Sequence, residues 1–252
     1  MVGRASLALI GALVVLSLVV GALIGAVGIG GILLVPGLVF LGKLAIHAAS
    51  ATALFSFLFT GIVSTWLYLR HGTLDIRASA WVCGGAIVSS FAGAYVNSLT
   101  DALVLARIIG TVIVLAGLNV LFPLRRAEVA VEGKRRSALL LSVGIAAGFG
   151  SGLTGAGGPL FSVPIMLGLG FPPLMSIGVS QVLQVISSVF GTLGNLAYGS
   201  VDLRAALWIV PAQLVGVAIG VAIAHRANVA QLRRMAGWLC VISGTFILLR
   251  GV

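Results

Sequence analysis

The chain has 252 residues, of which 60% are hydrophobic and 8% are charged, and its mean hydropathy is +1.23. Soluble domains carry about 25% charged residues, so this composition excludes a soluble globular protein and indicates an integral membrane protein. The net charge of +10 comes from basic residues at the ends of apolar runs. We therefore expect the lipid bilayer as a partner, and no nucleic acid.

Apolar runs long enough to cross a bilayer occur about eight times. The predicted spans are 7–27, 48–69, 77–98, 102–122, 138–154, 176–197, 203–224 and 229–249. A shorter apolar segment, 31–42 or 159–170, follows the first span of each half and contains Pro36 or Pro164. About twelve residues give roughly 18 Å of helix, too short for a core of about 30 Å. The sequence thus predicts an all-α membrane protein with a glycine-broken or re-entrant half-helix in each half.

The chain also contains one internal repeat. Gly25, Gly28, Gly30 and Gly31 recur 127 positions later as Gly152, Gly155, Gly157 and Gly158, and the same offset relates Asp75 to Asp202 and Trp81 to Trp208. We predict two homologous four-span repeats, residues 1–122 and 138–252, joined by a polar cytoplasmic linker at 123–137. An even number of spans per half favours parallel repeats, whereas five crossings per half would make the repeats inverted.

The distribution of basic residues predicts the orientation. If the N-terminus is cytoplasmic, ten of the fifteen Lys and Arg residues fall in cytoplasmic segments and five fall outside. This bias predicts a multi-pass protein of the inner (plasma) membrane with both termini and the linker in the cytoplasm. The sequence leaves open whether the protein forms a homodimer.

Each glycine cluster precedes an apolar helix, and the next span begins with small polar residues. Successive backbone N–H groups at a helix start form a site for anions, and neutral hydroxyls and amides add donors. The candidate substrate-binding residues that share this position are Gly28, Gly30, Gly31, Ser50, Thr52, Thr154, Gly155, Gly157, Gly158, Ser180, Gln181 and Gln184. The alternative is that the glycines only let helices approach closely and the hydroxyls bond to carbonyls of their own helix.

Ionisable residues are absent from the middle of the predicted spans. Asp75, Asp101 and Asp202 lie at helix ends, where we expect them to cap the following helix. This placement argues against a proton relay of carboxylates and favours a small anionic substrate bound by neutral dipoles. The histidines and cysteines have no metal-ligand spacing, so we expect neither a metal nor another cofactor.

These motifs together resemble the TauE/SafE sulfite exporter family. The matching segments are Gly28-Ile-Gly-Gly with Pro36, Gly155-Ala-Gly-Gly-Pro with Pro164, the polar starts Ala49-Ser-Ala-Thr52 and Ile177-Gly-Val-Ser180, and the turns Gly72-Thr-Leu-Asp75 and Gly199-Ser-Val-Asp202. The resemblance implies a secondary transporter that moves a small sulfur-containing anion, of the sulfite, thiosulfate, sulfonate or sulfoacetate class, by alternating access. It also places the substrate near the paired glycine breaks. Ile32 and Gln181 depart from the usual family pattern within this presumed pocket.

Two other functions remain as alternatives. The first is an anion channel or a transporter of another small anion, which needs the same kind of pocket. The second is an intramembrane serine hydrolase that uses Ser151 as its nucleophile. His47, His71 and His225 all lie near span ends, away from Ser151 in the sequence, so we expect the protein not to be an enzyme.

Overall fold

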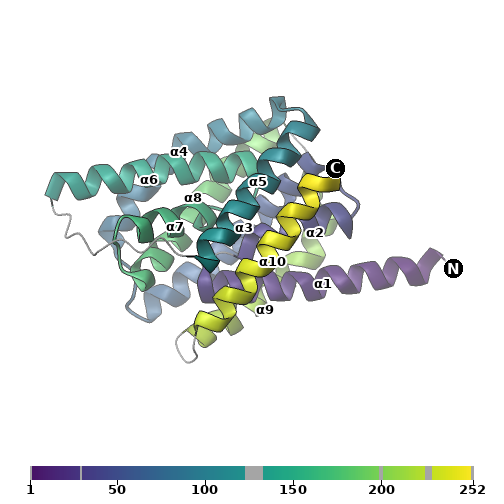
Figure 1. Ribbon diagram of the computed structural model, residues 1–252, viewed down its shortest axis with the longest axis horizontal. Helices are drawn as coiled ribbons and strands as arrows, with labels where there is room; N and C mark the ends of the chain where they lie inside the picture. The colour runs from purple at the N-terminus through teal and green to yellow at the C-terminus, as the bar shows by residue number, and fades with distance from the viewer. Residues whose placement is uncertain (1, 29, 123–132, 199–200, 225–228, 251–252) are drawn as a thin grey trace.

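The computed structural model describes residues 2–28, 30–122, 133–198, 201–224 and 229–250, and these residues form helices joined by short turns (Figure 1). The first half contains α1 (Val2–Val27), the short 3₁₀ helix η1 (Gly30–Leu33), α2 (Leu34–Phe40), α3 (Ile46–Arg70), α4 (Ile76–Leu99) and α5 (Ala102–Leu121). The second half contains α6 (Gly133–Thr154), α7 (Pro159–Gly168), α8 (Pro173–Tyr198), α9 (Leu203–Ala224) and α10 (Val229–Arg250).

Every predicted span and both short segments correspond to a helix. Within the described residues, six helices (α3, α4, α5, α6, α8 and α9) are long and apolar enough to cross a membrane. Asp75, Asp101 and Asp202 each accept a hydrogen bond from an N–H group in the first turn of the next helix, as predicted. The linker is shorter than predicted because residues 133–137 already belong to α6, and residues 123–132 lie outside the described residues.

The two halves run in opposite directions. Gly110 of α5 lies against Gly244 of α10, whereas Gly237 near the start of α10 lies against Leu121 at the end of α5, so these equivalent helices are antiparallel. Helices α3 and α8 are also antiparallel, since Leu54 faces Gly191 while Gly61 faces Gln184. The repeats are therefore inverted, and the favoured interpretation of parallel repeats is wrong.

The short helices account for this reversal. Gly30 lies against Leu23 and Gly37 lies against Leu16, so the chain turns back along α1 when it enters α2. Likewise, α7 turns back along α6, since Phe161 faces Gly150 while Phe171 lies beside Arg136. Each half thus consists of five alternating passes, the second of which is short. An odd number of passes inverts the second copy relative to the first.

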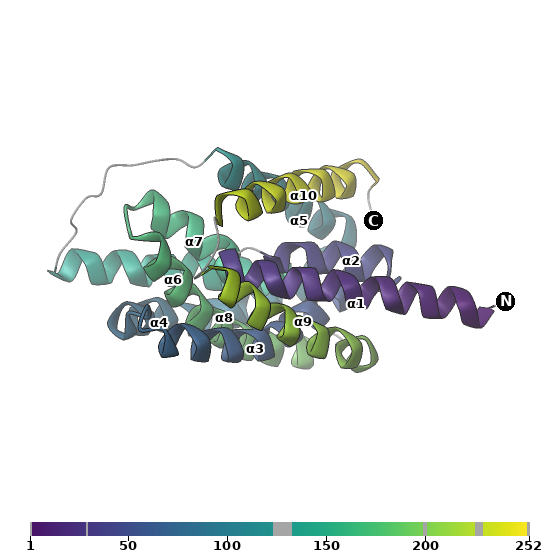
Figure 2. The ribbon, with the colours of Figure 1, turned by 90° about the horizontal axis from the view of Figure 1, so that it is seen from below.

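Because the repeats are inverted, the two termini lie at the opposite end of the molecule from the start of α6. We call the end where α6 begins the linker end. Figures 1 and 2 show that α1 begins and α10 ends at one end of the long axis, and that α6 begins at the opposite end. The prediction that the termini and the linker share one side of the membrane is therefore not met.

The two halves are interlocked. Helix α1 packs along α9, and α6 packs along α4, so the first helix of each half joins the fourth helix of the other. A Cβ at Gly25 would lie 2.4 Å from the Val217 carbonyl oxygen, and a Cβ at Gly152 would lie 2.1 Å from the Ser90 carbonyl oxygen. These are one contact repeated at the 127-residue offset. Small residues at these positions let the helix backbones approach closely.

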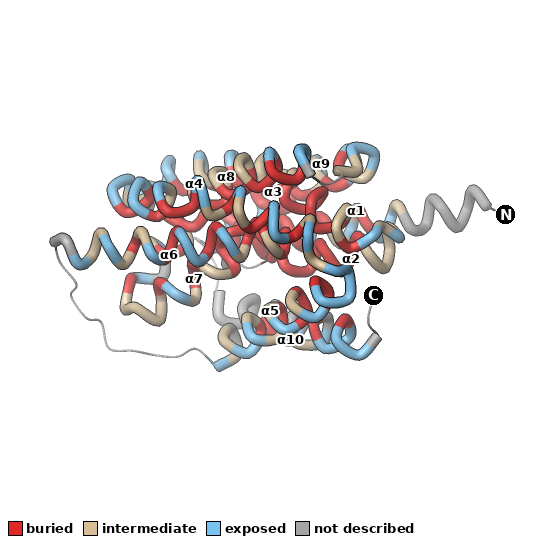
Figure 3. Tube along the Cα trace, turned by 90° about the horizontal axis from the view of Figure 1, so that it is seen from above, coloured by how far each residue is buried: buried red, intermediate tan, exposed pale blue. Residues whose placement is uncertain are grey.

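Burial is highest around α3 and α8. In their most apolar stretches 61% and 56% of the residues are buried, against 33% for α5. Figure 3 shows this buried centre enclosed by α1, α4, α6 and α9, whereas α5 and α10 pair with each other and form a largely exposed layer on one side. The glycine breaks at the ends of α1 and α6 lead into the buried centre.

Candidate functional site

The first break follows the end of α1. Gly28 has a φ of 79°, which glycine adopts without the strain of other residues, and its N–H donates to the Ile24 carbonyl at 2.9 Å. A Cβ at Gly28 would lie 3.6 Å from Nε2 of Gln181, so the side-chain amide of α8 lies directly beside this break. Gln181 Nε2 donates to the Ile24 carbonyl at 3.3 Å, and the buried Oε1 atom has no hydrogen-bond partner among the described residues.

The second break follows the end of α6. Gly155 and Gly157 have φ values of 67° and 86°. Thr154 Oγ1 donates to the Gly150 carbonyl at 2.7 Å and accepts from the N–H of Ala156 at 3.3 Å. Gly155 packs so tightly on α3 that a Cβ there would lie 2.3 Å from the Ser50 carbonyl oxygen. The break is thereby held against the first turns of α3.

The break at Gly155–Gly158 ends in an uncapped helix start. Gly158 is the N-cap residue of α7, no side chain caps this terminus, and Pro159 supplies no N–H. Within the described part of the chain, the N–H groups of Gly157 and Gly158 have no hydrogen-bond acceptor, although both residues are buried. Buried N–H groups need a partner, and at a helix N-terminus the helix dipole favours an anion.

The two breaks meet at the centre of the molecule. A Cβ at Gly31 would lie 2.7 Å from the Ala156 carbonyl oxygen, so the backbones of the two breaks are in contact. The ring of Phe57, which is fully buried, lies against both Gly31 and Gly157. The structure therefore brings together residues that are far apart in the sequence, in a region enclosed by α3 and α8.

Most of the predicted hydroxyl and amide groups already have partners. Ser50 donates to the His47 carbonyl at 2.9 Å, and Ser180 donates to the Ser176 carbonyl at 2.6 Å, as the packing alternative predicted. Thr52 Oγ1 accepts from the N–H of Asp202 at 2.9 Å and so contacts the start of α9. Among the predicted side-chain donors and acceptors, Gln181 is the one that carries a buried atom without a partner in the described structure.

Gln184 has a structural role in this arrangement. Its Nε2 donates to the Phe57 carbonyl at 3.1 Å and to Thr60 Oγ1 at 2.8 Å, which links α8 to α3. Gly30 also serves close packing, because a Cβ there would lie 2.5 Å from the Leu23 Cβ. Gly158 packs against Leu183 of α8 in the same way.

Asn97 and Phe57 were missed by the sequence reasoning. Asn97 Nδ2 donates to the Leu153 carbonyl at 2.6 Å and to Ser50 Oγ at 3.2 Å, and its Oδ1 lies 3.2 Å from His47 Nδ1. Asn97 thus ties α4 to the end of α6 beside the second break. An amide inside an apolar span was a usable signal for Asn97, whereas nothing in the sequence distinguishes Phe57 from the other apolar residues of its span.

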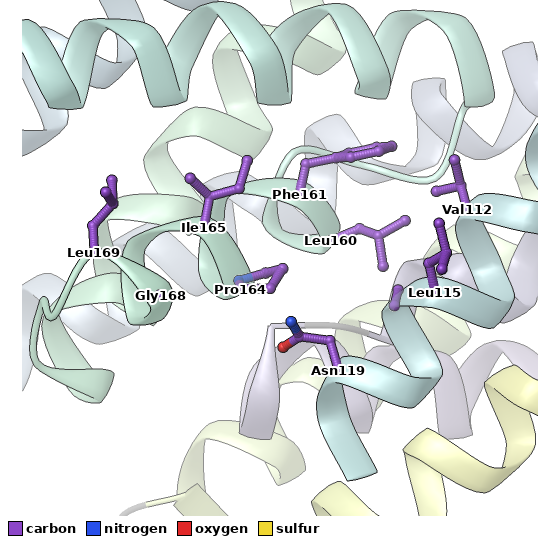
Figure 4. A pocket seen from close by; sticks show the side chains of 10 residues that line it. Val112, Leu115, Asn119, Leu160, Phe161, Pro164, Ile165, Gly168 and Leu169 are labelled. Carbon is purple, nitrogen blue, oxygen red and sulfur yellow. The ribbon is translucent and has the colours of Figure 1, made fainter. Parts of the chain in front are cut away.

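Two apolar cavities flank the short helices. One of 470 Å³ lies between α5 and α7, where Asn119 is the polar side chain of its lining and Leu160 belongs to the first turn of α7 (Figure 4). Its symmetry counterpart of 350 Å³ lies between α2 and α10, where Phe246 takes the place of Asn119. Each short helix therefore lines an open apolar cavity on the side facing the α5–α10 layer.

The hydrolase alternative finds no support in the site geometry. Ser151 is buried, and its Oγ has no partner in the part of the chain that the structure describes. Among the described histidines, His47 bonds to Asn97 and His71 bonds to the Leu67 carbonyl, and His225 lies outside the described residues. The described residues contain no cluster of His, Cys, Asp or Glu that could hold a metal ion.

An all-helical membrane protein with inverted repeats and broken helices at their interface has the architecture of secondary transporters. The family described as Sulfite exporter TauE/SafE matches residues 13–247, and the chain belongs to this family. It is 28% identical to the probable membrane transporter protein YunE of Bacillus subtilis, over 95% of this chain and 97% of that protein. It is 25% identical to the probable membrane transporter protein MJ0441 of Methanocaldococcus jannaschii, over 94% of each chain. No solved structure matches the protein.

Proposed function

We propose that the protein is a secondary transporter that moves a small sulfur-containing anion, of the sulfite, thiosulfate, sulfonate or sulfoacetate class, across the inner membrane by alternating access. The observation that carries this proposal is the pair of buried N–H groups of Gly157 and Gly158, which have no acceptor in the described structure and lie at the start of α7. The family name supplies sulfite, and the other sulfur anions come from the resemblance of the glycine breaks, polar span starts and turns to that family.

Binding at this site uses neutral dipoles. The breaks are surrounded by apolar and uncharged polar side chains, so an oxyanion would be held by backbone N–H groups and by the dipole of α7. Gln181 can add a donor if its side-chain amide rotates by half a turn. The rotation places Nε2 where Oε1 now lies, and it breaks the 3.3 Å hydrogen bond from Nε2 to the Ile24 carbonyl. Neutral donors avoid the cost of burying Lys or Arg in the membrane.

The charge distribution orients the proposed transporter. Ten of the fifteen Lys and Arg residues belong to helix ends and connectors at the linker end, and five (Arg4, Lys43, Arg107, Arg204 and Arg250) belong to the other end. By the positive-inside rule the linker end faces the cytoplasm, and both termini face the opposite side. Fusion of a reporter enzyme to each terminus and insertion of the same reporter into the linker would determine this orientation.

The inverted halves supply a route for alternating access. Exchange of conformations between two inverted copies converts a site open to one side into a site open to the other. The cavities beside α2 and α7 leave space into which the short helices can move. We propose that these helices move against the α5–α10 layer during transport.

The test compares two glycines with the same backbone strain. Gly28 at the break and Gly72 in a surface turn have φ values of 79° and 68°, and a Cβ at either would make no contact shorter than 3.4 Å. In proteoliposomes loaded with radiolabelled sulfite or thiosulfate, we expect Gly28→Ala to reduce transport at least tenfold and Gly72→Ala to leave it within twofold. Equal transport by both variants would refute a site at the breaks.

A further inference from the structure

A second site lies at the linker end, far from the glycine breaks. A cleft of 770 Å³ separates the first turns of α4 and α6, which run parallel. Its lining residues are Arg77, Ala78 and Trp81 of α4, and Arg136, Ser137, Ala138, Leu140 and Leu141 of α6. Arg136 lies 18 residues before Thr154, or about 27 Å along α6 at 1.5 Å per residue. The cleft is therefore separate from the proposed transport site.

Two guanidinium groups line the mouth of the cleft. Arg136 is held in place by Asp75, with 2.9 Å between Nη2 and Oδ2, and its side chain remains 39% exposed. The same Asp75 carboxylate also caps α4 through the N–H of Ala78. Arg77 is exposed and forms no ion pair within the described residues. Two arginines thus line the mouth and one of them is paired with a carboxylate, so the mouth keeps an excess positive charge.

The walls beyond the mouth are apolar. Trp81 is 48% exposed, and Leu140 and Leu141 form the facing wall. Gly84, three residues after Trp81 on α4, is also exposed and adds no side chain. An exposed Trp at the end of a spanning helix lies at the level of the lipid headgroups. A charged mouth followed by an apolar groove suits an amphiphile better than a free ion.

The other half provides an internal comparison. At the 127-residue offset Arg77 corresponds to Arg204 and Trp81 to Trp208, but Arg136 and Ser137 correspond to Leu9 and Ile10. The corresponding positions on α9 and α1 therefore keep one arginine and lack the second. The paired arginines occur at the linker end, which also carries the excess of Lys and Arg.

We propose that the cleft between α4 and α6 binds an anionic phospholipid. Arg77 and Arg136 donate to its headgroup phosphate, and Trp81 and Leu141 pack against the first carbons of its acyl chains. Basic pockets between membrane helices on the cytoplasmic side are suited to such headgroups. The bound lipid would fix the start of α6 against α4.

The experiment measures thermal unfolding of the full-length protein in a neutral detergent. A ligand that binds the folded state raises its stability by mass action. We expect phosphatidylglycerol to raise the unfolding temperature more than phosphatidylcholine does. We expect Arg77→Gln to weaken the apparent affinity roughly fivefold, since one arginine near an anionic lipid contributes about that factor. The matched control Arg204→Gln should leave the affinity unchanged.

Three outcomes would overturn the proposal. Equal stabilisation by phosphatidylcholine would show that charge is irrelevant. Equal loss of affinity in Arg77→Gln and Arg204→Gln would show a general surface effect. Full stabilisation by inorganic phosphate at matched ionic strength would show a site for small anions instead of a lipid. None of these outcomes concerns the glycine breaks, so the proposed transport function would stand or fall separately.

Discussion

The two glycine breaks occupy equivalent positions in the inverted halves but are held by different neighbours. The first lies beside Gln181, whose Oε1 has no partner within the described residues, and the nearest atoms leave room for a Cβ at Gly28. The second is packed against Ser50 and fastened by Asn97, which bonds to the Leu153 carbonyl. The equivalent glycines Gly28 and Gly155 thus share a positive φ, but of these two positions the neighbours leave room for a Cβ at Gly28 alone.

The largest expected loss of stability comes from substituting alanine for the equivalent glycine of each break. Gly155→Ala introduces a left-handed alanine and a steric clash with Ser50, so we expect it to lower the free energy of unfolding by about 2–5 kcal/mol. Gly28→Ala introduces the backbone strain alone and should cost about 1–2 kcal/mol. Thermal and denaturant unfolding of the purified variants would measure both. Equal losses would mean that the breaks are held equally firmly.

A smaller effect is expected from the two amides. Asn97→Leu removes the hydrogen bonds to Leu153 and Ser50 and should destabilise the protein by about 1–2 kcal/mol. Gln181→Leu removes one long bond and an atom that is already unpaired, so its stability should change by less than about 0.5 kcal/mol.

For anion binding we expect the opposite order of effects: Gln181→Leu should weaken binding more than Asn97→Leu. We expect Gln181→Leu to weaken stabilisation by sulfite or thiosulfate, measured as the ligand-induced rise in unfolding temperature. Asn97→Leu should retain this rise. If Gln181→Leu bound the anion as well as the unmodified protein, Gln181 would have no part in the site.

The smallest effect on stability is expected at the cavity between α5 and α7. Gly168 lines this cavity, and a Cβ there would meet no atom within 4 Å. Gly168→Phe should therefore fill the space, keep the stability within about 0.5 kcal/mol, and slow transport severalfold because α7 loses room to move. Gly11→Phe, at a position equally free of neighbours, is the control. Unchanged transport in Gly168→Phe would show that the cavity is not needed.

The helices, the repeat and the caps could be predicted because each leaves a local pattern. Apolar runs mark the spans, recurring glycines mark the repeat, and Asp75 and Asp202 precede helices that they cap. The direction of the repeats could not be predicted from span counting, because a pass as short as α2 is ambiguous by length alone. Its direction depends on contacts such as Gly37 with Leu16, which the sequence does not display.

For the candidate site, the sequence indicated the backbone positions of the breaks better than the contacts of the side chains around them. Glycines at positive φ are required by the backbone itself, so Gly28, Gly155 and Gly157 could be found from the sequence. Whether a hydroxyl faces a ligand or a carbonyl depends on tertiary packing, and Thr52 contacts the start of α9 instead of a break. The position of Phe57 between the breaks likewise depends on how α3 lies in the assembled fold.

The first helix of each half packs against the fourth helix of the other half, and this arrangement has a consequence for biosynthesis. Helix α1 is synthesised before its packing partner α9, which follows nearly two hundred residues later. During this interval the small-residue face of α1 around Gly21 and Gly25 has no native partner. Neither half can reach its final packing alone, so assembly is expected to finish only after α9 has entered the bilayer. Truncated chains that end before α9 should then be substrates for membrane quality control.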